Sequence, residues 1–176
     1  MRERCVKLLG SDCDEKKPFP YGTFAMNISK VAEVLPLLKR IDHVGIAVSD
    51  LDSAKDFYFR TFGLHVVHEE SNEEQGIREA MIAIGDSGSY IQLLAPLSQD
   101  SVIAKFLDKS GPGVQQIAYE VGDVVQVTDL LKTRGVRMVY EHPRRGTGGS
   151  LVNFAHPRDC GGVLIEFVQH TAQSRD

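Results

Sequence analysis

The chain has 176 residues, of which 42% are hydrophobic and 25% are charged. This composition is typical of a globular protein that is large enough for one domain with a substantial core. The net charge of -4 and the pI near 5.9 argue against a general nucleic-acid binder, which needs a basic surface. The longest apolar runs have the length of strands, far below the roughly 20 residues of a membrane-spanning helix. We therefore expect neither nucleic acid nor membrane among its partners.

The first part of the chain, residues 1–39, mixes basic and acidic residues and contains no apolar core of a signal peptide. We predict a flexible N-terminal leader over this range. The three cysteines, Cys5, Cys13 and Cys160, are odd in number and lack the spacing of a metal site. This pattern indicates reduced thiols in a cytosol-like compartment. We predict a cytoplasmic location, with the mitochondrial matrix as the alternative in a eukaryote.

The first predicted element is a strand over residues 41–48, in which apolar side chains alternate. A helix follows up to Phe62, with a start resembling a capping box at Ser49 and Asp52 and a stop at Gly63. Three further stretches read as strands and complete a β-α-β-β-β unit: residues 64–67, 77–84 and 90–94.

The second half of the chain repeats this plan. A strand over residues 114–121 leads into a helix over residues 123–134, which Gly135 ends. Three more predicted strands follow: residues 137–140, 152–154 and 163–168. Between the halves, residues 95–109 predict a connection with a short helix, before the breaker at residues 111–113.

These elements predict an α+β fold of two tandem βαβββ modules, which together form a half-open barrel around a shared cleft. We expect a single domain over residues 40–170. Its parts are module one at 40–96, a linker at 97–112 and module two at 113–170.

Polar residues occupy matching positions in the two modules. Residues 41–51 align without a gap on residues 114–124, which places His43 on Gln116. A second alignment, of residues 90–94 on 164–168, places Gln92 on Glu166. Two modules packed about a pseudo-two-fold axis would bring these four side chains together, and one divalent metal ion would satisfy them all.

Each of these residues also has a simpler explanation when it is considered alone. His43 is then an ordinary histidine with a satisfied hydrogen bond, and a glutamine on a strand needs only one polar partner. Glu79, beside Arg78, is then a surface charge. The recurrence at equivalent positions of the repeat is what favours a shared metal site over these explanations.

Over residues 39–170 the chain resembles the methylmalonyl-CoA epimerase family of the vicinal-oxygen-chelate, or glyoxalase-like, superfamily. The segments around Glu79 and Cys160 are specific to that family, whereas the His-Val-Gly-Ile-Ala motif is shared across the superfamily. The resemblance is carried by five segments: residues 41–47, 72–81, 91–94, 143–146 and 156–166.

The resemblance implies metal ligands at His43, Gln92 and Glu166, with a further ligand at Gln116, where the family usually has a second histidine. Because glutamine is a neutral oxygen donor, a site with two glutamines should bind hard divalent ions more weakly than a site with two histidines, and its preference should shift away from softer ions. The resemblance also implies acid and base roles for Glu79 and Glu166. The implied metal is Co²⁺ or Mn²⁺.

The implied reaction interconverts (R)- and (S)-methylmalonyl-CoA in propionate metabolism, by removing the α-proton and returning it through an enolate. The implied partners are the acyl-CoA substrate and a second copy of the chain in a homodimer. Arg144, Arg145 and Gly146 are candidates for binding the phosphates of the substrate. A solvated charged turn explains the two arginines equally well.

Two other enzyme types and one non-catalytic type use the same fold. Residues 111–118 also resemble a motif of hydroxyphenylpyruvate-type dioxygenases, but oxygen activation there needs two histidines and a carboxylate, and Gln116 removes the second histidine. A glyoxalase-type isomerase fits less well because of the segments around Glu79 and Cys160. A non-catalytic module that binds a small ligand remains as the alternative from a different class.

Overall fold

The computed structural model describes residues 37–73 and 76–171. The predicted leader at 1–39 therefore lies almost entirely outside the described residues. The first strand, β1 (Leu38–Ala47), includes the last two residues of the predicted leader. In the described part of the chain, no helix is long and apolar enough to cross a membrane.

The first module follows the predicted order of elements. After β1 come α2 (Leu51–Phe62), β2 (Val66–Asn72), β3 (Ile77–Ala83) and β4 (Tyr90–Pro96). The N-cap of α2 is Asp50 rather than Ser49: its backbone is extended, and its carboxylate accepts a 2.7 Å hydrogen bond from the Ser53 N–H. Gly63 ends the helix with φ of 70°, a conformation that favours glycine.

The second module begins after the linker helix and has the same plan. Its elements, with that helix first, are α3 (Val102–Ser110), β5 (Gly113–Val121), α4 (Val124–Thr133), β6 (Arg144–Arg145), the 3₁₀ turn η2 (Thr147–Gly149), β7 (Leu151–Ala155), the 3₁₀ turn η3 (Pro157–Asp159) and β8 (Leu164–Gln169).

The strand predicted over residues 137–140 is wrong. This segment makes one isolated bridge, from Met138 to Ala155, and the short strand of the module lies later, at β6. The ladder ends because the buried Asn153 side chain takes its place. Its Oδ1 accepts the Tyr140 N–H at 3.2 Å, and its Nδ2 donates to the Tyr140 carbonyl at 3.1 Å.

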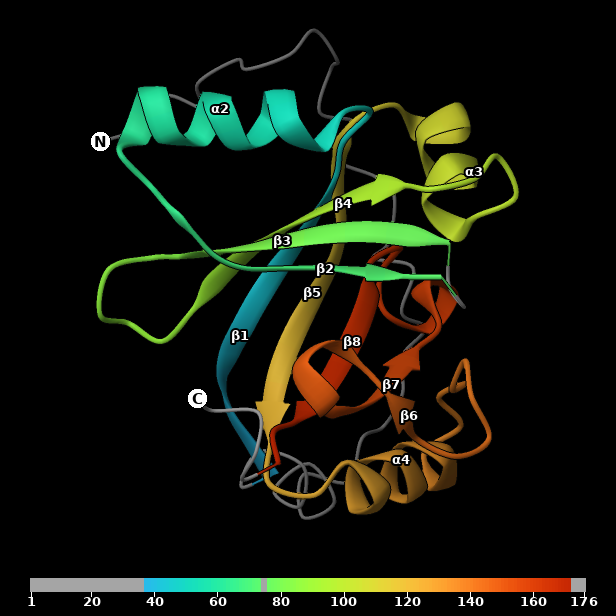
Figure 1. Cartoon of the computed structure of the whole chain (residues 1–176). Helices are drawn as coiled ribbons and strands as arrows, with labels where there is room; N and C mark the ends of the chain where they lie inside the picture. Colours follow the sequence, from blue (N-terminus) through green and yellow to red (C-terminus); the bar gives the residue numbers. More distant parts are fainter. Residues whose placement is uncertain (1–36, 74–75, 172–176) are drawn as a thin grey trace, which may run out of the picture.

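The strands of the described residues form one eight-stranded sheet in the order β2-β3-β4-β1-β5-β8-β7-β6. The antiparallel pair β1–β5 joins the two modules at its centre, and each of these strands pairs in parallel with the last strand of its own module. Figure 1 shows the sheet curling between α2 and α3 at one end and α4 at the other. The predicted pair of βαβββ modules in a half-open barrel is confirmed.

Each module packs its own helix against the outer face of its strands. Leu51 of α2 lies in a buried cluster against which Ile46 and Val48 pack, so the branched face of β1 is turned toward the helix. In the second module, Val124 and Val127 of α4 pack with Phe167. Full burial of such a side chain contributes about 1.5–3 kcal/mol. These two helices therefore do not cover the inner face of the barrel.

Candidate active site

Four adjacent strands at the centre of the sheet each supply one of the predicted metal ligands. In sheet order they are Gln92 on β4, His43 on β1, Gln116 on β5 and Glu166 on β8. All four side chains are buried, with between 4% and 7% of each residue exposed. The structure therefore brings together the four positions that the internal repeat predicts.

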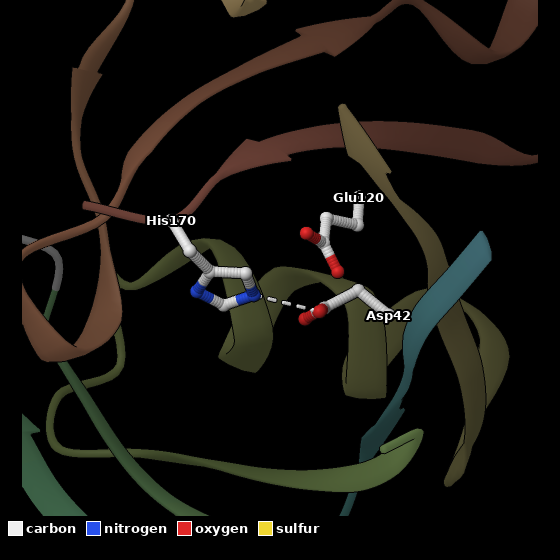
Figure 2. A group of neighbouring side chains, drawn as sticks. All are labelled: Asp42, Glu120 and His170. Atoms are coloured by element: carbon white, nitrogen blue, oxygen red, sulfur yellow. Dashed lines mark hydrogen bonds and ion pairs between the residues drawn. The ribbon is translucent and has the colours of Figure 1, made fainter. Parts of the chain in front are cut away.

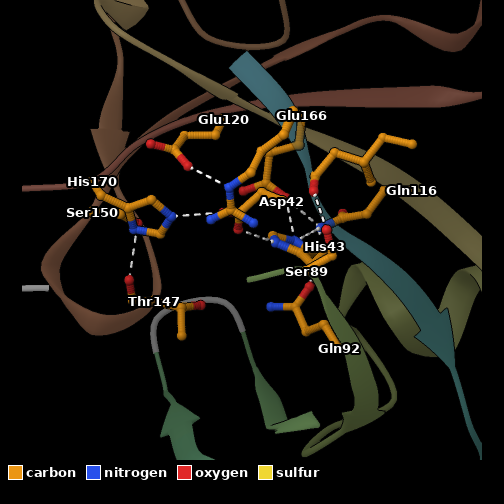
Figure 3. Close-up of polar contacts among 12 residues, drawn as sticks. Asp42, His43, Ser89, Gln92, Gln116, Glu120, Thr147, Ser150, Glu166 and His170 are labelled. Atoms are coloured by element: carbon orange, nitrogen blue, oxygen red, sulfur yellow. Dashed lines mark hydrogen bonds and ion pairs between the residues drawn. The ribbon is translucent and has the colours of Figure 1, made fainter. Parts of the chain in front are cut away.

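The Gln116 side chain lies at the meeting point of the other three. Its Nε2 donates to Glu166 Oε2 at 2.5 Å and to Gln92 Oε1 at 3.2 Å, and it lies 3.4 Å from His43 Nε2. His43 Nε2 in turn lies 3.1 Å from Glu166 Oε2. Figure 3 shows these side chains pointing toward one another from different strands.

Gly45 makes room for this convergence. It pairs with Gln92 on one side and with Gln116 on the other. A Cβ at this position would lie 2.6 Å from Gln116 Cγ, closer than carbon atoms approach. Only a residue without a side chain therefore lets Gln116 turn inward here.

Glu79 lies beside this group on β3 and is 2% exposed. One carboxylate oxygen accepts a 2.8 Å hydrogen bond from Gln92 Nε2, and the other accepts one from the Thr147 hydroxyl. Burial raises the pKa of Glu79 to about 7, although the Thr147 hydrogen bond opposes the rise. A carboxyl group with such a pKa suits proton transfer near neutral pH.

The pKa of His43 is also raised, but by neighbouring carboxylates and against the effect of burial. Burial alone would lower its pKa, but the charge of Glu166 and hydrogen bonds to Asp42 and Glu166 outweigh burial and raise the pKa to about 9. Without a metal, the imidazole is therefore protonated at neutral pH and neutralises a carboxylate that would otherwise be buried as an unpaired charge.

A second group of possible ligand atoms lies behind His43. Asp42, Glu120 and His170 hold theirs within 4.8 Å of one another (Figure 2). Cations already neutralise the two carboxylates: Arg40 donates to Glu120 at 2.8 Å and to Asp42 at 3.2 Å, and Lys39 pairs with Glu120 at 3.1 Å. This group is an ion-pair network rather than a site for a further cation.

Of the three predicted substrate-binding residues, one lines the cavity and the other two lie on the short strand before it. Gly146 lines a cavity of about 150 Å³ together with Glu79, Gln92, Gln116 and Glu166. Arg144 and Arg145 are exposed on β6 directly before it. The Arg144 guanidinium stacks over the Tyr140 ring at 4.3 Å, which holds this arginine against the rim.

Sequence reasoning missed two residues at the site. Thr147 lines the cavity and contacts Glu79; its position directly after Gly146 in the basic turn was the available signal. Asp42 contacts His43 Nδ1 at 2.9 Å, although strict strand alternation puts these neighbours on opposite faces. No pattern in the sequence marks the irregularity that brings them together.

Comparison with known proteins shows the family to which the chain belongs. Residues 42–154 match the Glyoxalase/Bleomycin resistance protein/Dioxygenase superfamily. The chain belongs to this superfamily. Membership implies a divalent-metal site, and the donor set of His43, Gln92, Gln116 and Glu166 fits one: an imidazole, a carboxylate and two amides converge, and Gly45 leaves space for them.

Within the superfamily, the chain is similar to methylmalonyl-CoA epimerases. It is 38% identical to the mitochondrial methylmalonyl-CoA epimerase of Homo sapiens, over 75% of this chain and 74% of that protein. The crystal structure of the Mycobacterium tuberculosis epimerase is 55% identical, with a TM-score of 0.74 over 77% of this chain and 90% of the other. The resemblance predicted from the sequence motifs is confirmed.

A third relative was solved with a ligand. A Streptomyces coelicolor methylmalonyl-CoA epimerase variant in complex with 2-nitronate-propionyl-CoA is 49% identical, with a TM-score of 0.75 over 77% of this chain and 97% of the other. The epimerases are therefore relatives in sequence and in fold. The individual roles predicted for the site residues stay predictions.

Proposed function

We propose that the protein is a methylmalonyl-CoA epimerase, an isomerase acting on an acyl-CoA. The observation that carries the proposal is Glu79, a buried carboxyl group with a pKa raised to about 7, beside four convergent polar side chains in one cavity. The similarity to methylmalonyl-CoA epimerases supports the substrate.

Glu79 is the proposed base that removes the α-proton between the thioester and the carboxylate. The C–H electron pair then passes to the thioester carbonyl to give an enolate, and Glu79 holds the proton. Thr147 and Gln92 fix the two carboxylate oxygens in place, so Glu79 needs little reorganisation before it reacts.

Glu166 is the proposed acid that returns a proton to the opposite face of the enolate. It comes from the second module, whereas Glu79 comes from the first, and both line the same cavity. Two carboxyl groups on different walls can serve the two faces of a planar intermediate. Glu166 is also a proposed ligand, which makes it the weaker acid-base group of the two.

His43, Gln92, Gln116 and Glu166 would hold the metal, for which we propose Co²⁺ or Mn²⁺. A bound divalent ion supplies Lewis-acid stabilisation of negative charge on a carbonyl oxygen. Without that ion, the Gln116 amide donates to both Glu166 and Gln92 and so holds these side chains of the cluster together.

Arg144, Arg145 and Gly146 are the proposed contacts for the phosphates of the coenzyme A moiety. The exposure of both arginines on β6, directly before the cavity-lining Gly146, supports this role. We also propose a homodimer, supported by three large apolar side chains of α2 that are more than half exposed: Phe57, Phe59 and Phe62. The cytoplasmic location and the domain limits of 40–170 stay predictions.

The alternatives are not favoured. The relatives compared above are methylmalonyl-CoA epimerases. Gln116 also stands where dioxygenase chemistry would need a second histidine. A non-catalytic binding module has no use for a buried carboxyl group with a pKa near neutrality at the wall of its cavity.

The test is deuterium uptake from heavy water into methylmalonyl-CoA, with metal-stripped protein and then with Co²⁺ or Mn²⁺ restored. We expect exchange at the α-carbon in the restored samples. The matched control is Glu79→Gln, which keeps the side-chain volume and should exchange little. A wild-type protein that exchanges no deuterium with either ion would overturn the proposal.

A further inference from the structure

Asp42 lies on the same side of β1 as His43 because the strand is irregular at this point. Across the β1–β5 pair, Ile41 faces Tyr119 and His43 faces Ala118, so Asp42 is one residue in excess. A β-bulge of this kind turns two consecutive side chains toward one side of the sheet. The Asp42 carboxylate consequently reaches its own neighbour: Oδ2 lies 2.9 Å from His43 Nδ1.

The Asp42 carboxylate is itself held from behind. Its other oxygen, Oδ1, accepts hydrogen bonds from His170 Nε2 at 2.7 Å and from Arg40 Nη2 at 3.2 Å. Asp42 is 1% exposed, so these contacts replace solvent around a buried charge. Figure 3 shows His170 and His43 on different sides of Asp42. The carboxylate therefore has little freedom to turn away from His43.

This arrangement decides which nitrogen of His43 faces the cluster of four. An ionised carboxylate only accepts hydrogen bonds, so Nδ1 carries the proton in the contact with Asp42. Nε2 is then the nitrogen left to bind a ligand. It is also the atom that lies near Glu166 and Gln116, at 3.1 and 3.4 Å. Imidazole ligands of metals are commonly oriented by a carboxylate on the far nitrogen, which also strengthens the metal bond.

We propose that Asp42 is a positioning residue, which fixes the His43 ring with Nε2 toward the cluster and so increases the affinity of the site for a divalent ion. The inference rests on the metal site of the proposed function. It adds a residue that touches neither the substrate nor the ion.

The second module has the same bulge without the same contact. Gly45 faces Gln116 and Ile46 faces Val114, so Gln115 is the residue in excess on β5. Gln115 thus corresponds to Asp42, just as Gln116 corresponds to His43. Among the described side chains, Gln115 Oε1 is the one buried polar atom without a hydrogen-bond partner. The bulge is thus common to both modules, whereas the orienting contact belongs to the first.

The test compares two variants of the same ion-pair network. Asp42→Asn removes the charge that faces His43 at nearly constant volume. Glu120→Gln removes a carboxylate of similar burial whose hydrogen bonds go to Lys39 and Arg40. Affinity for Mn²⁺ is measured on the full chain by titration, following free Mn²⁺ by electron paramagnetic resonance, and folding is followed by thermal melting without metal.

We expect Asp42→Asn to bind Mn²⁺ about 10- to 100-fold more weakly than the wild type, with Glu120→Gln unchanged. A folded Asp42→Asn protein with wild-type affinity would overturn the inference, and so would an equal loss in Glu120→Gln, because the network would then act only through stability. If Asp42→Asn does not fold, His170→Gln decides: a smaller loss of affinity supports the positioning role, and no loss contradicts it. A wild-type protein that binds no Mn²⁺ and no Co²⁺ would instead overturn the metal site itself.

Discussion

The two modules share a backbone plan but differ in the chemistry of their central strands. On β1, His43 follows the charged Asp42; on β5, Gln116 follows the neutral Gln115, whose Oε1 has no hydrogen-bond partner within residues 37–73 and 76–171. Gly45 of the first module corresponds to Ala118 of the second. The comparison teaches that the repeated backbone brings four side chains together, while each module contributes different functional groups. One side offers an oriented imidazole and the other a neutral amide.

The largest effect should come from the carboxylates that the two modules contribute. Glu79→Gln removes the proposed base and should lower turnover about 10²- to 10⁴-fold, with metal affinity retained. Glu166→Gln should lower both, because Glu166 is also a proposed ligand. The measurements are α-proton exchange and Mn²⁺ titration. An equal loss of Mn²⁺ affinity in both variants would contradict the proposal that Glu166 is a ligand and Glu79 is not.

Giving the first module the alanine of the second should break the site. A Cβ at position 45 would collide with Gln116, and such overpacking costs about 1–3 kcal/mol of folding stability. We expect Gly45→Ala to melt earlier and to bind metal poorly. The matched control is Gly113→Ala on β5, where a Cβ would meet nothing within 4 Å. Similar melting curves for the two variants would contradict the packing argument.

Making the two modules more alike should shift the metal preference. Gln116→His replaces a neutral amide by a second imidazole, which favours softer ions such as Zn²⁺. We expect Zn²⁺ affinity to rise relative to that for Mn²⁺ by about tenfold, the order of magnitude seen when metal-site surroundings change. Competition titrations of the two ions measure this ratio. An unchanged ratio would mean that Gln116 is not a ligand.

Thr147 connects the modules, since it lies in the second and donates to Glu79 of the first. This hydrogen bond opposes the effect of burial, and the pKa of Glu79 is raised to about 7 with both in place. A base works in its ionised form, so activity should rise with pH through that value. Thr147→Val should move the rise to higher pH, whereas Thr147→Ser, which keeps the hydroxyl, should not. A pH–rate profile measures both, and identical profiles would exclude the role.

The smallest effect concerns a feature that belongs to the second module alone. Replacing Arg144 and Arg145 by alanine should raise KM for methylmalonyl-CoA about two- to fivefold, the range expected of exposed ion pairs. A thioester substrate without the nucleotide should be unaffected. Steady-state kinetics on both substrates make the comparison. Equal changes for both would remove these arginines from nucleotide binding.

The internal repeat predicted most of the fold and the four convergent residues, because period-two and helical patterns persist through both modules. The strand predicted at 137–140 failed because the Asn153 side chain replaces its ladder at Tyr140, a contact between elements that no local pattern shows. Asp42 was missed for a related reason: a bulge depends on how β1 pairs with β5, and alternation alone puts adjacent residues on opposite faces.

The central position of the β1–β5 pair has a consequence for how the protein folds. His43 and Glu166 are 123 residues apart in the chain, so the cluster of proposed ligands forms only after strands distant in the sequence have met. Contacts of such high sequence separation form slowly, because the chain loses entropy before it gains them. A metal ion that binds only the folded state would stabilise the contact between strands that are far apart in the sequence. At a concentration of 100 times its dissociation constant, it would add about 2.7 kcal/mol to stability.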